Sequence, residues 1–235
     1  RIFALSSANR SIFHFPAIVT VSKGKYMIAI FGGTFDPVHL GHLNMAQQCV
    51  ATFKLHSLYF MPCAIPAHKA APGISTEHRI AMLKAAITPY APFKLDLREL
   101  QRSGPSYSLL SLQELRAENP DTPILFLIGM DSFNNFDKWY QWQTITRLCH
   151  LVVYQRPGQI CDTQGELKCY QHNAVTTDIA LLQKTNAGHL YFLEGEQLDA
   201  ASSEIRQALK KSTKKSELLP DAVSHYIKQH QLYQE

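Results

Sequence analysis

The stretch "IAIFGGTFDPVHLGH", residues 28–42, joins an apolar run to a turn that holds two glycines, an aspartate-proline pair and two histidines. A turn that only reversed the direction of the chain would need a Gly or a Pro and no more. His39 and His42 are three residues apart, so both imidazoles are expected on one face of the first turn of a helix. The stretch therefore predicts a strand, a ligand-binding turn and a helix in succession.

The rest of the chain repeats this alternation of apolar and amphipathic segments. Apolar runs predict strands at 27–31, 57–61, 93–97, 124–128, 151–154 and 190–193. Amphipathic segments predict helices at 39–53, 76–88, 108–118, 136–148, 202–211 and 221–229. Alternation of this kind, with right-handed crossovers, predicts an α/β fold built on a doubly wound parallel sheet, whose ligands bind at the carboxyl ends of the strands.

Length and composition are those of a globular chain. The sequence has 235 residues, of which 46% are hydrophobic, enough to bury a substantial core. Because the strand pattern begins at Met27, we expect a single domain over residues 27–235. Residues 1–26 are expected to be an N-terminal extension that need not belong to the fold.

Charge and cysteine usage argue against several classes of partner. The net charge of +4 is mild for a nucleic-acid-binding protein, and the dense basic run at 210–215 is expected to be a solvated helix end or loop. No apolar run reaches the roughly 18 residues that would span a membrane. Five scattered cysteines without a C-x-x-C pair argue against a zinc site or a disulfide framework and predict a reducing, cytoplasmic setting.

The residues of the turn suit a polyphosphate. Gly32 and Gly33 let the backbone approach a ligand and take φ values that other residues avoid. The unpaired N–H groups of the helix start favour an anion, and His39 and His42 can donate hydrogen bonds to its oxygens. Gly41 is expected to leave room for a flat ring or a ribose.

Other interpretations of the same turn, as a metal site, a core position or another nucleotide-binding motif, have less support. A histidine there could be a zinc ligand or a buried core residue, but no obvious third metal ligand lies nearby in the sequence. A dinucleotide fingerprint is excluded because the stretch has no G-x-G-x-x-G, and no G-K-[ST] follows the glycines as in a Walker loop.

The segment "GGTFDPVHLGH" resembles the signature of the nucleotidylyltransferase superfamily, in which T/S-x-G-H or H-x-G-H binds ATP phosphates. Further segments resemble, in order, those of the bacterial nicotinate-nucleotide adenylyltransferase family. They are "PAHK" (66–69), "ELQRSGPSYS" (99–108), "IGMDSFNNFDKWYQW" (128–142), "SSEIR" (202–206) and "LPDAVSHYIKQHQLY" (219–233). The first motif is typical of the whole superfamily, whereas the ordered set is specific to this family.

The resemblance implies a Rossmann-like sheet of the nucleotidylyltransferase type and a reaction. ATP and nicotinate mononucleotide would give nicotinate adenine dinucleotide and pyrophosphate, a step of NAD biosynthesis. Because the attacking group is already a phosphate, the transfer would be a direct in-line attack with no covalent enzyme intermediate. Mg²⁺ would bridge the ATP phosphates, with no dedicated protein ligands.

The resemblance also implies roles for individual residues. His39 and His42 would be the catalytic residues, stabilising charge in the transition state. The residues implied in ATP binding are Gly32, Gly33, Thr34, Phe35, His39, His42, Ser202, Ser203 and Arg206. Those implied in nicotinate mononucleotide binding are Lys69, Tyr107, Ser108, Asp131, Trp139 and Tyr140.

Some of these residues also have purely structural interpretations. Ser202 could cap a helix, as could Asp131, and Trp139 and Trp142 could be core aromatics. Ala201 stands where the family usually has Ser, which leaves the role of that hydroxyl open.

A few further residues are assigned less firmly. Arg102 is a second candidate, beside Lys69, for contact with a phosphate, and Arg156 is a candidate for the adenine end. His68 is left between phosphate contact and loop packing.

Competing interpretations differ in acceptor or in chemistry. "HLGH" is similar to the H-I-G-H element of class I aminoacyl-tRNA synthetases, but "KKSTKKS" (210–216) lacks the hydrophobic second residue of their K-M-S-K-S. Within the superfamily the acceptor could be nicotinamide mononucleotide or phosphopantetheine, or the enzyme could be a cytidylyltransferase. A non-catalytic nucleotide-binding module is the third alternative. The sequence does not fix the oligomeric state.

Overall fold

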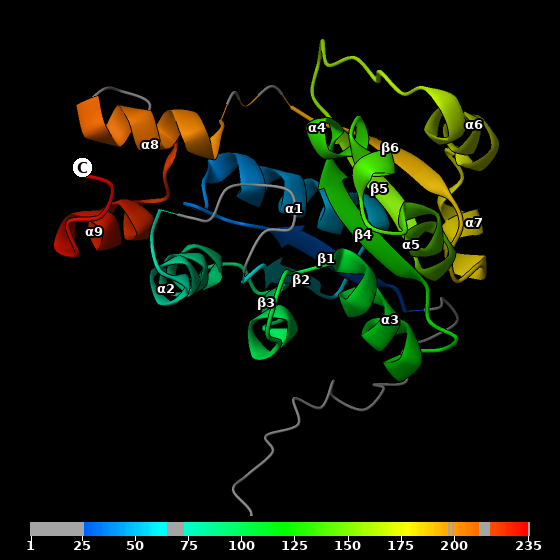
Figure 1. The fold of residues 1–235 in the computed structure, drawn as a ribbon, viewed down its shortest axis with the longest axis horizontal. Helices are drawn as coiled ribbons and strands as arrows, with labels where there is room; N and C mark the ends of the chain where they lie inside the picture. Colours follow the sequence, from blue (N-terminus) through cyan, green and yellow to red (C-terminus); the bar gives the residue numbers. More distant parts are fainter. Residues whose placement is uncertain (1–25, 65–72, 197, 199, 212–216, 235) are drawn as a thin grey trace, which may run out of the picture.

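The computed structural model describes residues 26–64, 73–196, 198, 200–211 and 217–234. They build one sheet with helices packed on both of its faces (Figure 1). The strands are β1 (Ile28–Gly33), β2 (Leu58–Pro62), β3 (Phe93–Leu95), β4 (Ile124–Gly129), β5 (His150–Gln155) and β6 (Leu190–Glu194). All pair in parallel in the order β3-β2-β1-β4-β5-β6, which confirms the predicted doubly wound α/β sheet.

The helices lie where the chain crosses between strands. They are α1 (Leu40–Phe53), α2 (Thr76–Ile87), α3 (Ser108–Glu118), α4 (Met130–Phe133), α5 (Trp142–Leu148), α6 (Gly165–Ala174), α7 (Ile179–Lys184), α8 (Ser202–Lys211) and α9 (Asp221–Gln229). Two short 3-10 helices, η1 (Arg98–Gln101) and η2 (Phe136–Lys138), complete the described elements. None of these helices is both long enough and apolar enough to cross a membrane.

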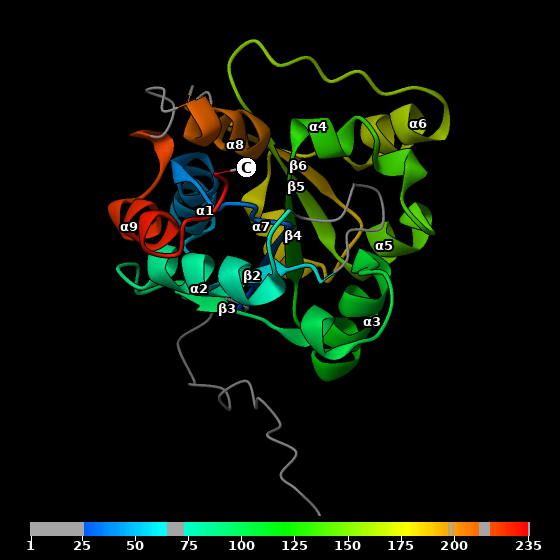
Figure 2. The ribbon, with the colours of Figure 1, turned by 60° about the vertical axis from the view of Figure 1, so that its left-hand side comes forward.

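All the strands except β3 contribute side chains to two separate hydrophobic clusters, one on each face of the sheet. On one face, Ala29 and Phe31 pack with side chains of α1, α2 and α9. On the other face, Ile28 and Ile30 pack with side chains of α3 and α5. Figure 2 shows α1, α2 and α9 gathered on one side of the sheet and α3, α5 and α6 on the other. Burial on both faces explains why the central strands have near-continuous apolar sequences.

The helix predicted over 136–148 is wrong as a single element. It is divided into η2 and α5, and Gln141 between them has the left-handed φ of 49°. The predicted pattern also omitted η1, α4, α6 and α7. Of these, η1, α4 and α7 are too short to show a helical period, and α6 buries only Leu167 and Ala174.

The order of the strands places a crevice above the centre of the sheet. The chain moves from β1 outward to β2 and β3, and then returns to place β4 on the other side of β1. The loops that follow β1 and β4 therefore leave the sheet in opposite directions, and ligands of such sheets bind at this switch point.

The predicted N-terminal extension lies, apart from Tyr26, outside the described residues. The boundary at residue 27 therefore stays a prediction.

Candidate functional site

Two cavities lie at the carboxyl edge of the sheet, one of about 610 Å³ and one of about 520 Å³. The residues that line both are Gly32, Gly33, Thr34, Asp131, Ser132 and Trp139. These residues follow or end β1 and β4, so the shared wall is the switch point of the sheet. Two ligands, one in each cavity, would meet above the end of β1.

The two histidines of the opening motif stack on one another in the first cavity. Their ring centroids are 3.7 Å apart with 26° between the planes. His42 Nδ1 accepts a hydrogen bond from the His39 backbone N–H at 3.3 Å. An accepting Nδ1 places the proton of a neutral imidazole on Nε2, so His42 offers an N–H donor at its far edge.

His39 is neutral at physiological pH. Its side chain is only 4% exposed, and burial, assisted by the nearby Arg156 guanidinium, lowers its pKa to about 4. His39 Nδ1 is buried and has no hydrogen-bond partner among the described groups. A buried polar atom without a partner costs free energy, which a ligand or water bound in this cavity would recover.

The glycines of the turn are required for close packing and not for unusual backbone angles. The expectation that Gly32 and Gly33 take φ values forbidden to other residues is wrong, since neither has a positive φ. A Cβ on Gly32 would lie 3.3 Å from the Phe126 ring, and one on Gly33 would lie 3.0 Å from the Phe35 ring. The positive φ of the turn belongs to Phe35, at 48°.

Gly41 lines the first cavity, and the space in the direction of its missing Cβ is filled by protein atoms. A Cβ there would lie 3.0 Å from the His39 imidazole and 3.1 Å from the Ala200 methyl group. Gly41 therefore allows the imidazole of His39 to fold back over the helix start.

Phe35, predicted to bind ATP, is mainly a core residue. Its side chain is 2% exposed and its ring packs against Phe31, Phe60 and His42. It still contributes to the wall of the first cavity.

The late helix α8 brings its predicted residues to the same cavity as the histidines. Ser202, Ser203 and Arg206 all line it. Ser202 Oγ donates to the Pro37 carbonyl at 3.1 Å, and Arg206 Nη1 donates to the Asp36 carbonyl at 2.6 Å. These bonds fasten the start of α8 to the turn after β1, a contact between segments about 170 residues apart.

Aromatic side chains line the second cavity. Trp139, Tyr140 and Tyr107 lie there, with the Tyr107 and Tyr140 rings 5.0 Å apart. Ser108, at the start of α3, lines it as well. Trp142 is instead a core residue, 7% exposed. Such a cavity suits a flat heterocycle held by stacking.

Four polar residues that the sequence suggested as ligand contacts differ in their position relative to the cavities. Arg156 lines the first cavity, and its Nη2 lies 4.0 Å from the exposed Asp131 carboxylate, which borders both cavities. Arg102 is not among the residues that line either cavity. Lys69 and His68 lie outside the described residues, so their roles stay predictions.

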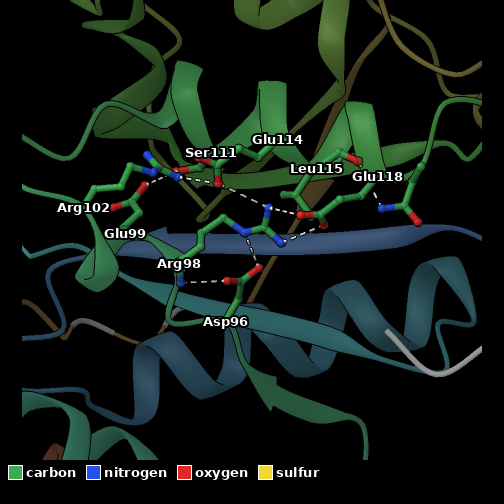
Figure 3. A network of polar contacts seen from close by, with 9 residues as sticks. Asp96, Arg98, Glu99, Arg102, Ser111, Glu114, Leu115 and Glu118 are labelled. Carbon is green, nitrogen blue, oxygen red and sulfur yellow. Dashed lines mark hydrogen bonds and ion pairs between the residues drawn. The ribbon is translucent and has the colours of Figure 1, made fainter. Parts of the chain in front are cut away.

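Arg102 belongs instead to a polar network between η1 and α3 (Figure 3). Its Nη2 donates to Ser111 Oγ at 2.9 Å and to Glu114 Oε2 at 3.0 Å. Ser111 in turn donates to Glu99 at 2.7 Å. Glu99 is buried beside the second cavity, and burial raises the pKa of its carboxyl group.

Sequence reasoning missed Arg79, which lies beneath the turn. It is 1% exposed, and its guanidinium donates to the carbonyls of Thr34 and Cys63 at 2.8 Å and of Ala64 at 3.2 Å. It thereby fastens the ends of β1 and β2 together. Its position in the apolar stripe of α2, with Met82, was a signal in the sequence.

The described residues contain no group of three or more His, Cys, Asp or Glu side chains arranged to hold a metal ion. The histidine pair is accordingly not part of a protein zinc site of the usual kind within that part of the chain.

The strand order and the cavities at its switch point are those of a nucleotide-binding protein of the doubly wound α/β class. Residues 30–208 match the family described as Cytidylyltransferase-like. A curated relative from Psychromonas ingrahamii is 40% identical over 206 residues, covering 88% of this chain and 96% of the relative. Another, from Legionella pneumophila (strain Lens), is 40% identical over 215 residues, covering 89% of this chain and 100% of the relative.

Both relatives are named "Probable nicotinate-nucleotide adenylyltransferase". The chain belongs to the nicotinate-nucleotide adenylyltransferase family. A solved structure of Plasmodium falciparum nicotinic acid mononucleotide adenylyltransferase, complexed with NaAD, shares the fold. It has a TM-score of 0.66 and 19% identity, and the match covers 88% of this chain and 97% of that one.

Proposed function

We propose that this chain transfers the adenylyl group of ATP to nicotinate mononucleotide, forming nicotinate adenine dinucleotide and pyrophosphate in NAD biosynthesis. Family membership supports the reaction. The observation that carries the assignment to this site is the pair of adjoining cavities. One holds the stacked histidines and Arg206, and the other is lined by aromatic rings.

ATP would occupy the first cavity with its phosphates at the start of α1. There His42 Nε2–H, Arg206 and the N–H groups of the helix start would stabilise charge on the leaving pyrophosphate. His39 would meet ATP as a neutral imidazole, because burial lowers its pKa to about 4 before the phosphates enter the cavity. The remaining residues proposed to contact ATP are Gly32, Gly33, Thr34, Phe35, Ser202 and Ser203.

Nicotinate mononucleotide would occupy the second cavity with its pyridine ring among Trp139, Tyr107 and Tyr140. Asp131 and Ser108 would offer polar contacts, and Lys69 is proposed on the family resemblance alone. Since the two cavities share the wall after β1, the acceptor phosphate would approach the α-phosphorus from the side opposite to the pyrophosphate. Catalysis would then consist of alignment and charge stabilisation, without a protein nucleophile.

We also propose Mg²⁺ as the metal of the reaction, held mainly by substrate phosphates and water. Three carboxylates line the cavities in the described part of the chain: Asp36, Glu99 and Asp131. Asp36 and Glu99 accept hydrogen bonds from Tyr233 and Ser111, so the exposed Asp131 is the carboxylate best placed to support a hydrated ion. Mg²⁺ with one or no protein carboxylate is a common arrangement where phosphates supply the other ligands. The bound ion would neutralise phosphate charge.

The cellular setting and the domain boundary are proposals of the same kind. We propose that the protein is cytoplasmic, since all five of its cysteines are free. We propose a single catalytic domain over residues 27–235, and we propose that neither nucleic acid nor membrane is a partner.

The first test is pyrophosphate release from ATP and Mg²⁺, with nicotinate mononucleotide, nicotinamide mononucleotide and phosphopantetheine offered separately. We expect release with nicotinate mononucleotide. For His42→Ala we expect a loss of about 10²- to 10³-fold in kcat, as when an essential donor to a developing negative charge is removed. The matched control is His225→Ala, which truncates an exposed histidine of α9 and should leave the rate unchanged.

Release with another acceptor alone would keep the chemistry and change the substrate. No release with any acceptor, while ATP still raises the melting temperature, would favour a non-catalytic nucleotide-binding module.

A further inference from the structure

The segment after α9 contacts the turn that follows β1. Tyr233 OH donates a hydrogen bond to Asp36 Oδ1 at 2.6 Å, although the two residues are 197 positions apart. Leu232 and Tyr233 both pack against the hydrophobic cluster on this face of the sheet. The contact is thus an internal one, made by a side chain that reaches into the fold.

The backbone of this segment is held in an uncommon shape. Gln231 has φ of 51° and Tyr233 has φ of 62°, values that residues with a β-carbon seldom adopt. Such conformations persist where the surrounding contacts fix them, and they often mark functional positions. The positive φ of Gln231 belongs to the C-cap of α9, where the Leu232 N–H donates to the Ile227 carbonyl at 3.0 Å. Tyr233 is held by its apolar packing and by the bond to Asp36.

Asp36 joins this segment to the first cavity. Its side chain is 5% exposed and lines that cavity. While Oδ1 accepts from Tyr233, Oδ2 lies 3.7 Å from Arg206 Nη1, and the same Nη1 donates to the Asp36 carbonyl at 2.6 Å. The carboxylate is therefore shared between a phenol and a guanidinium.

We propose that Tyr233 is a positioning residue for the ATP half of the site, acting through Asp36 on Arg206. This inference rests on the proposed function, in which Arg206 contacts ATP phosphates. By occupying Oδ1, the phenol keeps the carboxylate from turning onto the guanidinium as a two-oxygen pair. An arginine paired in that way has fewer N–H groups to offer a phosphate.

The Tyr233 hydroxyl acts as a permanent donor. Burial, followed by the hydrogen bond to Asp36 and the charge of its carboxylate, raises the pKa of the phenol well above its usual range, whereas the nearby Arg206 and Arg79 act in the opposite direction. The phenol therefore stays protonated through the neutral pH range, so Tyr233 itself acts as a donor under assay conditions.

The test is Tyr233→Phe, which removes the hydroxyl and keeps the ring that packs on the core. We expect KM for ATP to rise about five- to tenfold, less than the direct loss of a hydrogen bond to a charged group would give, because the hydroxyl acts on Arg206 only through Asp36. KM for nicotinate mononucleotide should change less than twofold, because neither Asp36 nor Arg206 lines the second cavity. Calorimetric titration with a non-hydrolysable ATP analogue should show the same loss of affinity, independently of the acceptor.

The matched control is Tyr226→Phe, which removes a phenol from α9 that lies 3.0 Å from His78 Nδ1 on α2. It loosens the same end of the chain without touching Asp36, so both KM values should stay at wild type. A second variant tests whether Tyr233 acts through the Asp36 carboxylate. In an Asp36→Asn background that carboxylate is absent, so adding Tyr233→Phe should alter ATP affinity less than twofold.

Unchanged ATP affinity in Tyr233→Phe would overturn the inference, and so would an equal rise in both KM values or a full additive effect in the Asp36→Asn background. If the wild-type protein neither binds the ATP analogue nor releases pyrophosphate, the proposed function fails instead.

Discussion

At Gly41 the position of the His39 imidazole depends on a missing methyl group. A Cβ would lie 3.0 Å from the His39 ring and 3.1 Å from the Ala200 methyl, closer than most Cβ contacts. For Gly41→Ala we therefore expect the imidazole to be displaced from its stacked position on His42. We predict a drop of about 10- to 100-fold in kcat/KM, measured by pyrophosphate release, with misplacement of a catalytic group as the cause.

The control for this variant is Lys168→Ala, which truncates an exposed residue of α6 that lines neither cavity. Its kcat/KM should match that of the wild-type protein. Full activity in Gly41→Ala would show that the stacked arrangement of the histidines has no catalytic importance.

The location of several residues could be predicted because the sequence itself holds the signal. The histidines, Ser202 and Arg206 meet in one cavity as expected, because motif residues at a strand end and a helix start converge in this sheet type. Asp36 and Tyr233 were not predicted as a pair, since nothing local links positions so far apart. Only the folded chain shows that they touch.

Among the elements, η1 and α3 are joined by charged and polar side chains rather than by a large apolar contact. Arg102 donates hydrogen bonds to Ser111 and to the half-exposed Glu114, and Ser111 donates one to the buried Glu99. For Arg102→Ala we predict a loss of about 1 kcal/mol in the free energy of unfolding, since it leaves a hydrogen-bond partner unsatisfied. KM for nicotinate mononucleotide should remain within about threefold, because Arg102 contacts partners other than ligand.

The contrasting variant is Tyr140→Ala, whose half-exposed side chain lines the second cavity. It should raise KM for nicotinate mononucleotide with little change in the urea midpoint. A large rise of that KM in Arg102→Ala, with unchanged stability, would return Arg102 to the list of phosphate ligands.

Most elements could be predicted because each buries a stripe or a face with a clear period. The segment 136–148 was predicted as one helix because Phe136, Trp139 and Trp142 have helical spacing, yet the three side chains serve two different purposes. Phe136 and Trp142 fill the core, whereas Trp139 faces both cavities. The chain breaks its helix at Gln141 to separate these functions.

For the whole molecule, two buried histidines set the response to acid. His150, fully buried at the start of β5, donates from Nε2 to the Thr185 carbonyl at 3.0 Å and accepts at Nδ1 from the His189 N–H at 3.1 Å. Burial lowers the pKa of His150 to about 4, as it does for His39. Both histidines have their ordinary pKa, near 6.5, in the unfolded chain, so the unfolded state binds more protons between these values.

Stability should therefore fall as pH is lowered from about 6.5 toward about 4, by up to about 1.4 kcal/mol per pH unit for each histidine. Urea unfolding across this range measures the slope. His150→Gln, which can donate and accept at the same two partners, should make the slope shallower. An unchanged slope in that variant would assign the acid response to other groups.

For the whole molecule, the sequence was most informative about the sheet. It was least informative about the long-range contacts that join elements at the edge of the sheet. The alternation of strands and helices predicted a doubly wound sheet, and the helix-start motif predicted the edge that carries the site. The fastening contacts of Arg79 and Tyr233 join elements on that edge across the fold. Their partners are set by three-dimensional packing and leave no periodic trace.

The bond between Asp36 and Tyr233 also has a consequence for how the chain is made. Ribosomes add residues from the N-terminal end, and the 197 positions between these partners take about 10–40 s at about 5–20 residues per second. Throughout that interval β1 and the turn after it are already synthesised, while the phenol that holds the turn does not yet exist. A nascent chain therefore carries its histidine motif in a less restrained form, and the turn gains its last fastening only when the domain is nearly complete.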